Sequence, residues 1–125
     1  MKSITPPNWP NQAAHYSPGV ISGNLLYISG QLSADPLTKE VPATIAAETI
    51  AALTGMDNVL KAAGLTKNNV VSCRVYTTNV EYWDEINRVY AEYFGDHRPA
   101  RAIVPVQPLH FGCNIEIEAI AELTP

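Results

Sequence analysis

Two carboxylates near the end of the chain are the first residues whose spacing suggests chemistry. Residues 115–121 read IEIEAIA. In a strand, alternate side chains point to opposite faces, so Glu116 and Glu118 would share one face with Ile120, opposite the remaining isoleucines and alanines. A carboxylate on a central, partly enclosed strand must be paired or hydrogen-bonded, and it could accept a proton or position water. The simpler interpretation is a solvated outer face of an amphipathic strand.

Arg101 is the second candidate, because it opens the apolar run 102–106 directly after a proline-containing loop. Its guanidinium carries a planar fork of donors that matches a carboxylate, so an arginine between a loop and a buried strand is suited to bind an acid. A surface arginine, or one in a salt bridge with Glu116 or Glu118, would show the same spacing.

Other kinds of site find no support in the sequence. The three histidines have no carboxylate or cysteine at metal-ligand spacing, so we expect no metal site and no cofactor. The chain has neither a nucleophile-elbow pattern nor a phosphate-binding glycine loop. Cys73 and Cys113 each lie in an apolar, strand-like run, and we expect two reduced, buried thiols rather than a disulfide.

The elements that must position these residues follow from the apolar periodicity. They are a hairpin at 20–30, a helix at 45–63, a strand at 70–78, a helix at 81–94, and strands at 102–106 and 114–122. Thr44 and Gly64 are the expected caps of the first helix. Val71 is predicted to share a face with Cys73, and Trp83 to belong to the apolar stripe of the second helix.

This order predicts an α+β fold, in which a mixed β-sheet carries two helices packed on one face, within a single domain over residues 1–125. Only 16% of the 125 residues are charged and 46% are hydrophobic, whereas about 25% charged is usual. Disorder is therefore excluded. The open sheet face and the shortage of charge together predict that copies of the chain pack against one another in a closed oligomer.

Charge and hydropathy also limit the partners. The net charge is −4 and the basic residues are scattered, so a nucleic acid is an unexpected partner. No run approaches the length of a membrane span, and the proline-rich start lacks the apolar segment of a signal peptide. We therefore expect a cytoplasmic protein, with an organelle as the alternative location.

Several segments resemble the reactive-intermediate deaminase family (RidA or YjgF-type proteins, also called the L-PSP endoribonuclease family). They occur in the family's order and span about residues 15–122. The matching segments are Tyr16-Ser17, LYISGQ at 26–31, the helix segment 55–64, the strand 70–79, Asn87–Tyr90 with Tyr93-Phe94, Pro99-Ala100-Arg101, and IEIEAIA at 115–121.

The resemblance implies a chorismate-mutase-like fold that assembles as a homotrimer with clefts between subunits. It also implies hydrolysis of small enamine or imine acids, such as 2-aminoacrylate, to 2-keto acids and ammonia. Arg101 would hold the substrate carboxylate and Glu116 would polarise the attacking water. The residues that would line the cleft are Tyr16, Ser29, Gly30 and Asn87.

Two alternatives stay open. Ile103 and Pro105 stand where many family members have a cysteine and an acid. That departure is compatible with a non-enzymatic metabolite-binding or chaperone-like trimer. The loop before Pro99 is short, which would widen the cleft for a larger acid such as 2-aminomuconate. Ribonuclease activity, attributed to some relatives, is the least favoured function because no basic stripe is present.

Overall fold

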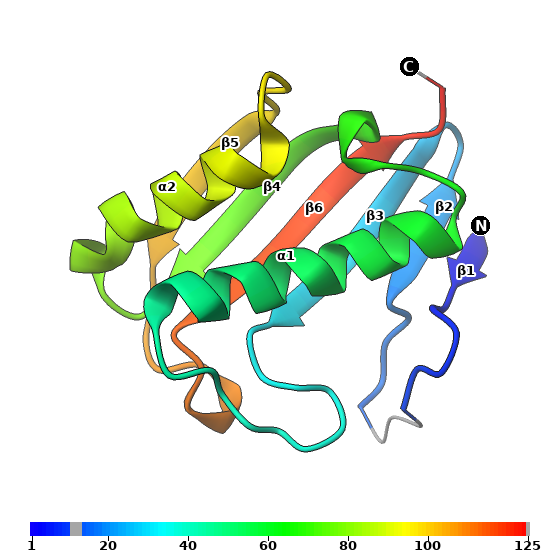
Figure 1. The fold of residues 1–125 in the computed structure, drawn as a ribbon. Coiled ribbons are helices and arrows are strands. Elements are labelled where there is room, and N and C mark those ends of the chain that lie inside the picture. Colours follow the sequence, from blue (N-terminus) through cyan, green and yellow to red (C-terminus); the bar gives the residue numbers. More distant parts are fainter. Residues whose placement is uncertain (11–13, 125) are drawn as a thin grey trace.

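The computed structural model describes residues 1–10 and 14–124, and within them six strands form one sheet in the order β1-β2-β3-β6-β4-β5 (Figure 1). The strands are β1 (Lys2–Ile4), β2 (Gly19–Ser22), β3 (Leu25–Leu32), β4 (Val70–Thr77), β5 (Ala100–Pro105) and β6 (Ile115–Glu122). The helices are α1 (Ile45–Ala62) and α2 (Trp83–Phe94). β4 and β5 are parallel, and every other neighbouring pair is antiparallel.

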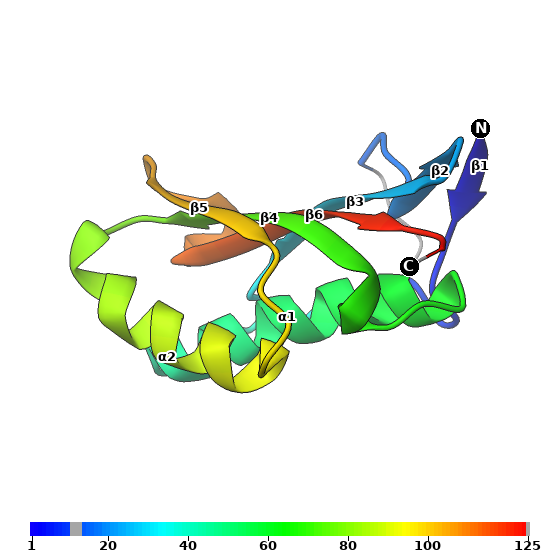
Figure 2. The same ribbon diagram turned by 90° about the horizontal axis from the view of Figure 1, so that it is seen from above.

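Both helices pack on the same face of this mixed sheet, and the opposite face carries no helix (Figure 2). The predicted α+β fold class is therefore confirmed. The strand β6 lies at the centre between β3 and β4, and its residues alternate strictly between buried and half-buried. Ile115 and Ile117 are fully buried beneath the helices, whereas Glu116 and Glu118 point to the open face, as the period of two predicts.

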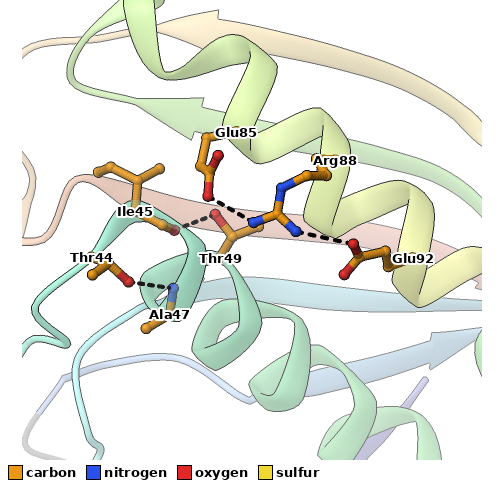
Figure 3. Close-up of polar contacts among 7 residues, drawn as sticks. All are labelled: Thr44, Ile45, Ala47, Thr49, Glu85, Arg88 and Glu92. Carbon is orange, nitrogen blue, oxygen red and sulfur yellow. Dashed lines mark hydrogen bonds and ion pairs between the residues drawn. The ribbon is translucent and has the colours of Figure 1, made fainter.

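Local side-chain contacts set the limits of the helices, and they match the sequence signals. The Thr44 hydroxyl accepts a hydrogen bond from the Ala47 N–H at 3.1 Å, which satisfies one free donor at the start of α1 (Figure 3). Gly64 adopts a φ of 75°, a left-handed conformation that favours glycine just after a helix. On α2, Arg88 forms ion pairs with Glu85 at 2.7 Å and Glu92 at 3.0 Å (Figure 3).

The structure corrects three of the predictions. The proline-rich segment at the start of the chain, for which no strand is predicted, forms the edge strand β1, because Ile4 buries its side chain beside β2. Val71 is exposed rather than facing the core with Cys73, because the pairing of β4 with β6 shifts by one residue between Val70 and Ser72. Trp83 is 40% exposed rather than part of the buried stripe, since it lies in the first turn of α2.

In the part of the chain that the structure describes, neither helix is both long and apolar enough to span a membrane.

Candidate active site

A cavity of about 1190 Å³ lies along β3 and extends over the open face of the sheet. Four of the predicted site residues line it: Tyr16, Ser29, Gly30 and Glu116. We call these four residues the glutamate half-site. They come from three separate segments of the chain, so the sheet, rather than local sequence, brings them together.

A bulge in β3 shapes this half-site. Ile28 is paired with Ala119 and Gln31 with Ile117, so Ser29 and Gly30 together stand opposite a single residue of β6. A β-bulge of this kind bends the strand and changes the direction of its side chains. A Cβ atom on Gly30 would lie 2.8 Å from a carboxylate oxygen of Glu116, so only glycine lets that carboxylate lie against β3.

Glu116 is a partly buried carboxyl group that has no partner in the described part of the chain. Among the described residues, its side chain takes part in no hydrogen bond or ion pair. Burial raises the pKa of the Glu116 carboxyl, and the neighbouring charge of Glu118 raises it further. A carboxylate whose charge is disfavoured in this way holds a proton more readily than an exposed one, which is the property that a general base requires.

Glu118 lies two residues along the same face, and its surroundings differ. The Tyr76 hydroxyl donates a hydrogen bond to its carboxylate at 2.6 Å, and Arg74 lies at ion-pair distance, 3.7 Å. That hydrogen bond also raises the pKa of Tyr76, because it favours the protonated phenol. Both glutamates line the cavity, but among the described residues only Glu116 of the two has neither carboxylate oxygen paired.

Arg101 lies on the other face of the sheet. It is paired with Cys73 in the register of β4 and β5, and paired residues share a face, so its side chain is on the helix-covered side. Its Nη1 donates a hydrogen bond to the side-chain oxygen of Asn87 at 2.9 Å. The guanidinium carbon lies 4.8 Å from the ring centre of Tyr90 and 5.5 Å from that of Trp83.

We call Asn87 and Arg101, with the two aromatic rings, the arginine half-site. No carboxylate of the described residues pairs with Arg101, so the salt bridge to Glu116 or Glu118 considered from the sequence does not form. The predicted site residues thus fall into two groups, and the sheet lies between them. A small acid therefore cannot contact Arg101 and Glu116 within the same chain.

Three residues of the site region have roles that the sequence does not predict. The sequence predicts core or interface packing for Trp83 and Tyr90, and Tyr90 does lie in the core, but the two residues are also spaced four and three residues from Asn87 and so share its helix face. That spacing was the signal available in the sequence. It indicates a role at the site only because the structure places Arg101 against the same face of α2. Glu48 falls four residues after Thr44, one residue too late for a capping box, so the sequence predicts no role for it.

Glu48 instead anchors the end of the glutamate half-site. Its carboxylate is only 2% exposed and accepts hydrogen bonds from the Ser33 hydroxyl at 2.7 Å, the Asn114 N–H at 2.8 Å and the Asn114 side-chain amide at 2.9 Å. These bonds join the end of β3, the start of α1 and the residue before β6. A buried carboxylate with three donors is well compensated, and this one fixes the position of the strand that carries Glu116.

The side chains that could bind a metal are histidines, cysteines, aspartates and glutamates. Across residues 1–10 and 14–124, no group of three or more histidine, cysteine, aspartate or glutamate side chains is arranged to hold a metal ion. Cys73 and Cys113 are free and buried, as predicted. Burial raises the pKa of the Cys73 thiol.

The fold and the site define a class of protein: an α+β sheet with both helices on one face, an arginine half-site beneath them and a glutamate half-site on the open face. The model of the family described as Endoribonuclease L-PSP matches residues 7–123. The chain belongs to this family, which is the RidA/YjgF-type family that its motifs indicate.

Individual relatives agree with this assignment. A RutC family protein of Pyrococcus horikoshii is 41% identical over 115 residues, which cover 91% of each chain. The 2-iminobutanoate/2-iminopropanoate deaminase of Bos taurus is 39% identical over 99% of this chain and 91% of its own. The crystal structure of Escherichia coli TdcF with bound serine superimposes with a TM-score of 0.89, at 31% identity over 98% of both chains.

Proposed function

We propose that this protein is a hydrolytic deaminase of small enamine and imine acids of the 2-aminoacrylate type. The enamine first tautomerises to the imine. Water then adds to the imine carbon, the C=N bond is replaced by C=O, and both hydrogens of the water leave on nitrogen as ammonia, giving a 2-keto acid. The imine carbon is already electrophilic, so placing the acid and activating the water are what the protein must supply.

The observation that carries the proposal is the unpaired guanidinium of Arg101. It is half-buried, it has no anionic partner among the described residues, and Asn87 occupies only one of its five N–H donors. A cation held in that way is stabilised when an incoming carboxylate accepts two parallel hydrogen bonds. The substrate carboxylate would therefore bind to Arg101.

Glu116 would handle the protons. Its carboxylate has free oxygens and a raised pKa, so it can take a proton from the attacking water and return it to the leaving nitrogen. Tyr16, Ser29 and Gly30 would line the cleft beside it. The Ser29 hydroxyl donates to the Ser17 carbonyl at 2.7 Å, which leaves its oxygen available to accept a hydrogen bond from the ligand.

The two half-sites would meet across the interface of a homotrimer, with the arginine half-site of one subunit facing the glutamate half-site of the next. The separation of the half-sites by the sheet supports this arrangement, because a single chain cannot bring them to one ligand. The open face also offers apolar side chains to another copy; Tyr27, for example, is exposed there and is paired with Ile120 on β6.

The relatives support the same reaction class. The bovine relative is named as a deaminase of 2-iminobutanoate and 2-iminopropanoate. TdcF was solved with serine, itself a small amino acid. Both ligand types carry a carboxylate on a short chain, which is the group that Arg101 is suited to bind.

The test is to generate 2-aminoacrylate in situ and to follow release of the keto acid with the wild type, with R101A and with R98A. Arg98 is an exposed arginine three residues away and serves as the matched control. We expect the wild type and R98A to accelerate release equally and R101A to lose at least about 100-fold in kcat/KM. No acceleration by the wild type, or full activity in R101A, would contradict the proposal; saturable keto-acid binding without turnover would indicate a binding protein instead.

A further inference from the structure

Three residues on one face of α2 surround the guanidinium of Arg101. Trp83, Asn87 and Tyr90 are spaced at i, i+4 and i+7, so they lie in a row along the helix. Asn87 accepts one hydrogen bond from Arg101, and the two aromatic rings lie within the distance at which a ring face attracts a cation. The helix thus supplies every side-chain hydrogen bond and ring contact that Arg101 has among the described residues.

The two rings differ in their access to solvent. Tyr90 is buried, with only 6% of its surface exposed, whereas Trp83 is 40% exposed. Tyr90 therefore contacts the guanidinium of Arg101 on the side of the core, and Trp83 contacts it on the side of the solvent. Because the indole of Trp83 is exposed beside the guanidinium of Arg101, a ligand that binds this guanidinium would also contact the indole.

We propose that Trp83 is a specificity-determining residue of the carboxylate subsite; this inference rests on the function proposed above. Trp83 holds Arg101 from the outer side and covers the carbon chain of the bound acid. A planar imino acid with a short apolar chain stacks on the indole and loses water from both surfaces. An acid with a second carboxylate is disfavoured, because that group loses hydration at the ring.

The first experiment uses the fluorescence of Trp83 itself. The chain has two tryptophans, so W9F leaves Trp83 as the only indole and W83F leaves Trp9. The W9F and W83F variants would each be titrated with 2-oxobutanoate, an unreactive analogue of the substrate, and binding would be measured in parallel by calorimetry. The emission of W9F should change saturably with the calorimetric midpoint, and the change should vanish in W9F/R101Q. An unchanged emission of W9F while calorimetry shows the site filled would overturn the inference.

The second experiment measures selectivity in W83F and W83L with 2-iminobutanoate and 2-iminoglutarate, each generated in situ. In W83L we expect KM for 2-iminobutanoate to rise about tenfold with kcat nearly unchanged, and the preference over 2-iminoglutarate to fall by a similar factor. W83F should stay within about threefold of the wild type, because it keeps an aromatic face.

The outcomes separate the inference from the proposed function. Unchanged KM and preference in W83L would overturn the role of Trp83 while leaving the deaminase intact. Absence of both turnover and 2-oxobutanoate binding in the wild type would overturn the proposed function itself. If W83L fails to fold, the titration of W9F, which keeps Trp83, still decides the question.

Discussion

Arg101 and Glu116 are ionisable residues of the same sheet, but their side chains lie on opposite faces and in different surroundings. Arg101 is held in place by an amide oxygen and two aromatic rings, all of them neutral. Glu116 has no such partner, and burial disfavours its charge. One half-site is therefore organised for binding an anion, and the other for exchanging a proton.

Glu118 and Arg88 are charged residues whose charges are compensated by neighbouring side chains. Glu118 is compensated by Tyr76 and Arg74, and Arg88 by Glu85 and Glu92 on its own helix. Such pairs on the surface contribute little to stability and leave nothing for a ligand. The two residues of the proposed site, unlike Glu118 and Arg88, lack a partner of opposite charge among the described residues.

The largest effect is expected from removing the proton acceptor. In E116Q the amide keeps the shape of the side chain but cannot take a proton, so kcat should fall about 10³-fold with KM changed only a few-fold. The matched control is E118Q, on the same strand and face, which should lose less than about threefold because Glu118 already has partners. Steady-state kinetics with 2-aminoacrylate would check both. An equal loss in the two variants would remove the distinction between the glutamates.

The next prediction concerns the separation of the half-sites. R101Q and E116Q should each be nearly inactive alone, yet subunits co-expressed in equal amounts should recover about a quarter of the wild-type activity. Roughly three trimers in four are then mixed, and each mixed trimer keeps about one intact cleft of its three. The two subunit types carry different affinity tags, so that mixed trimers can be isolated. If isolated mixed trimers stay inactive, the site does not lie between subunits.

The smallest effect concerns stability and pH. The folded-state pKa of Glu116 is raised above its unfolded value, so the folded protein holds more protons than the unfolded one between those two values, and stability falls as pH rises through that interval. Above it, E116Q should melt at a higher temperature than the wild type, because the amide carries no charge to bury. Near pH 4 the two should converge. Thermal melting at pH 4 and pH 7 checks this, and E118Q, which loses bonds to Tyr76 and Arg74, should show no such gain.

Much of the fold could be read from the sequence because it is encoded locally. The alternation in residues 115–121 fixed which side chains of β6 face the helices, and Thr44 and Gly64 marked the ends of α1. The shift in β4 that exposes Val71 had no local signal, because a strand's register depends on its partner. The same is true of β1, which exists only because β2 offers it an edge.

For the site, the sequence by itself determined which residue types are present and, through the family motifs, which of them to examine. Only the tertiary structure decided how they are grouped. The parallel pairing of β5 with β4 turns Arg101 toward α2, and the bulge in β3 brings Gly30 against Glu116. The physical reason is that face and direction are set by hydrogen bonds between strands far apart in the chain, and a residue's charge is compensated or left free by neighbours that its own sequence does not specify.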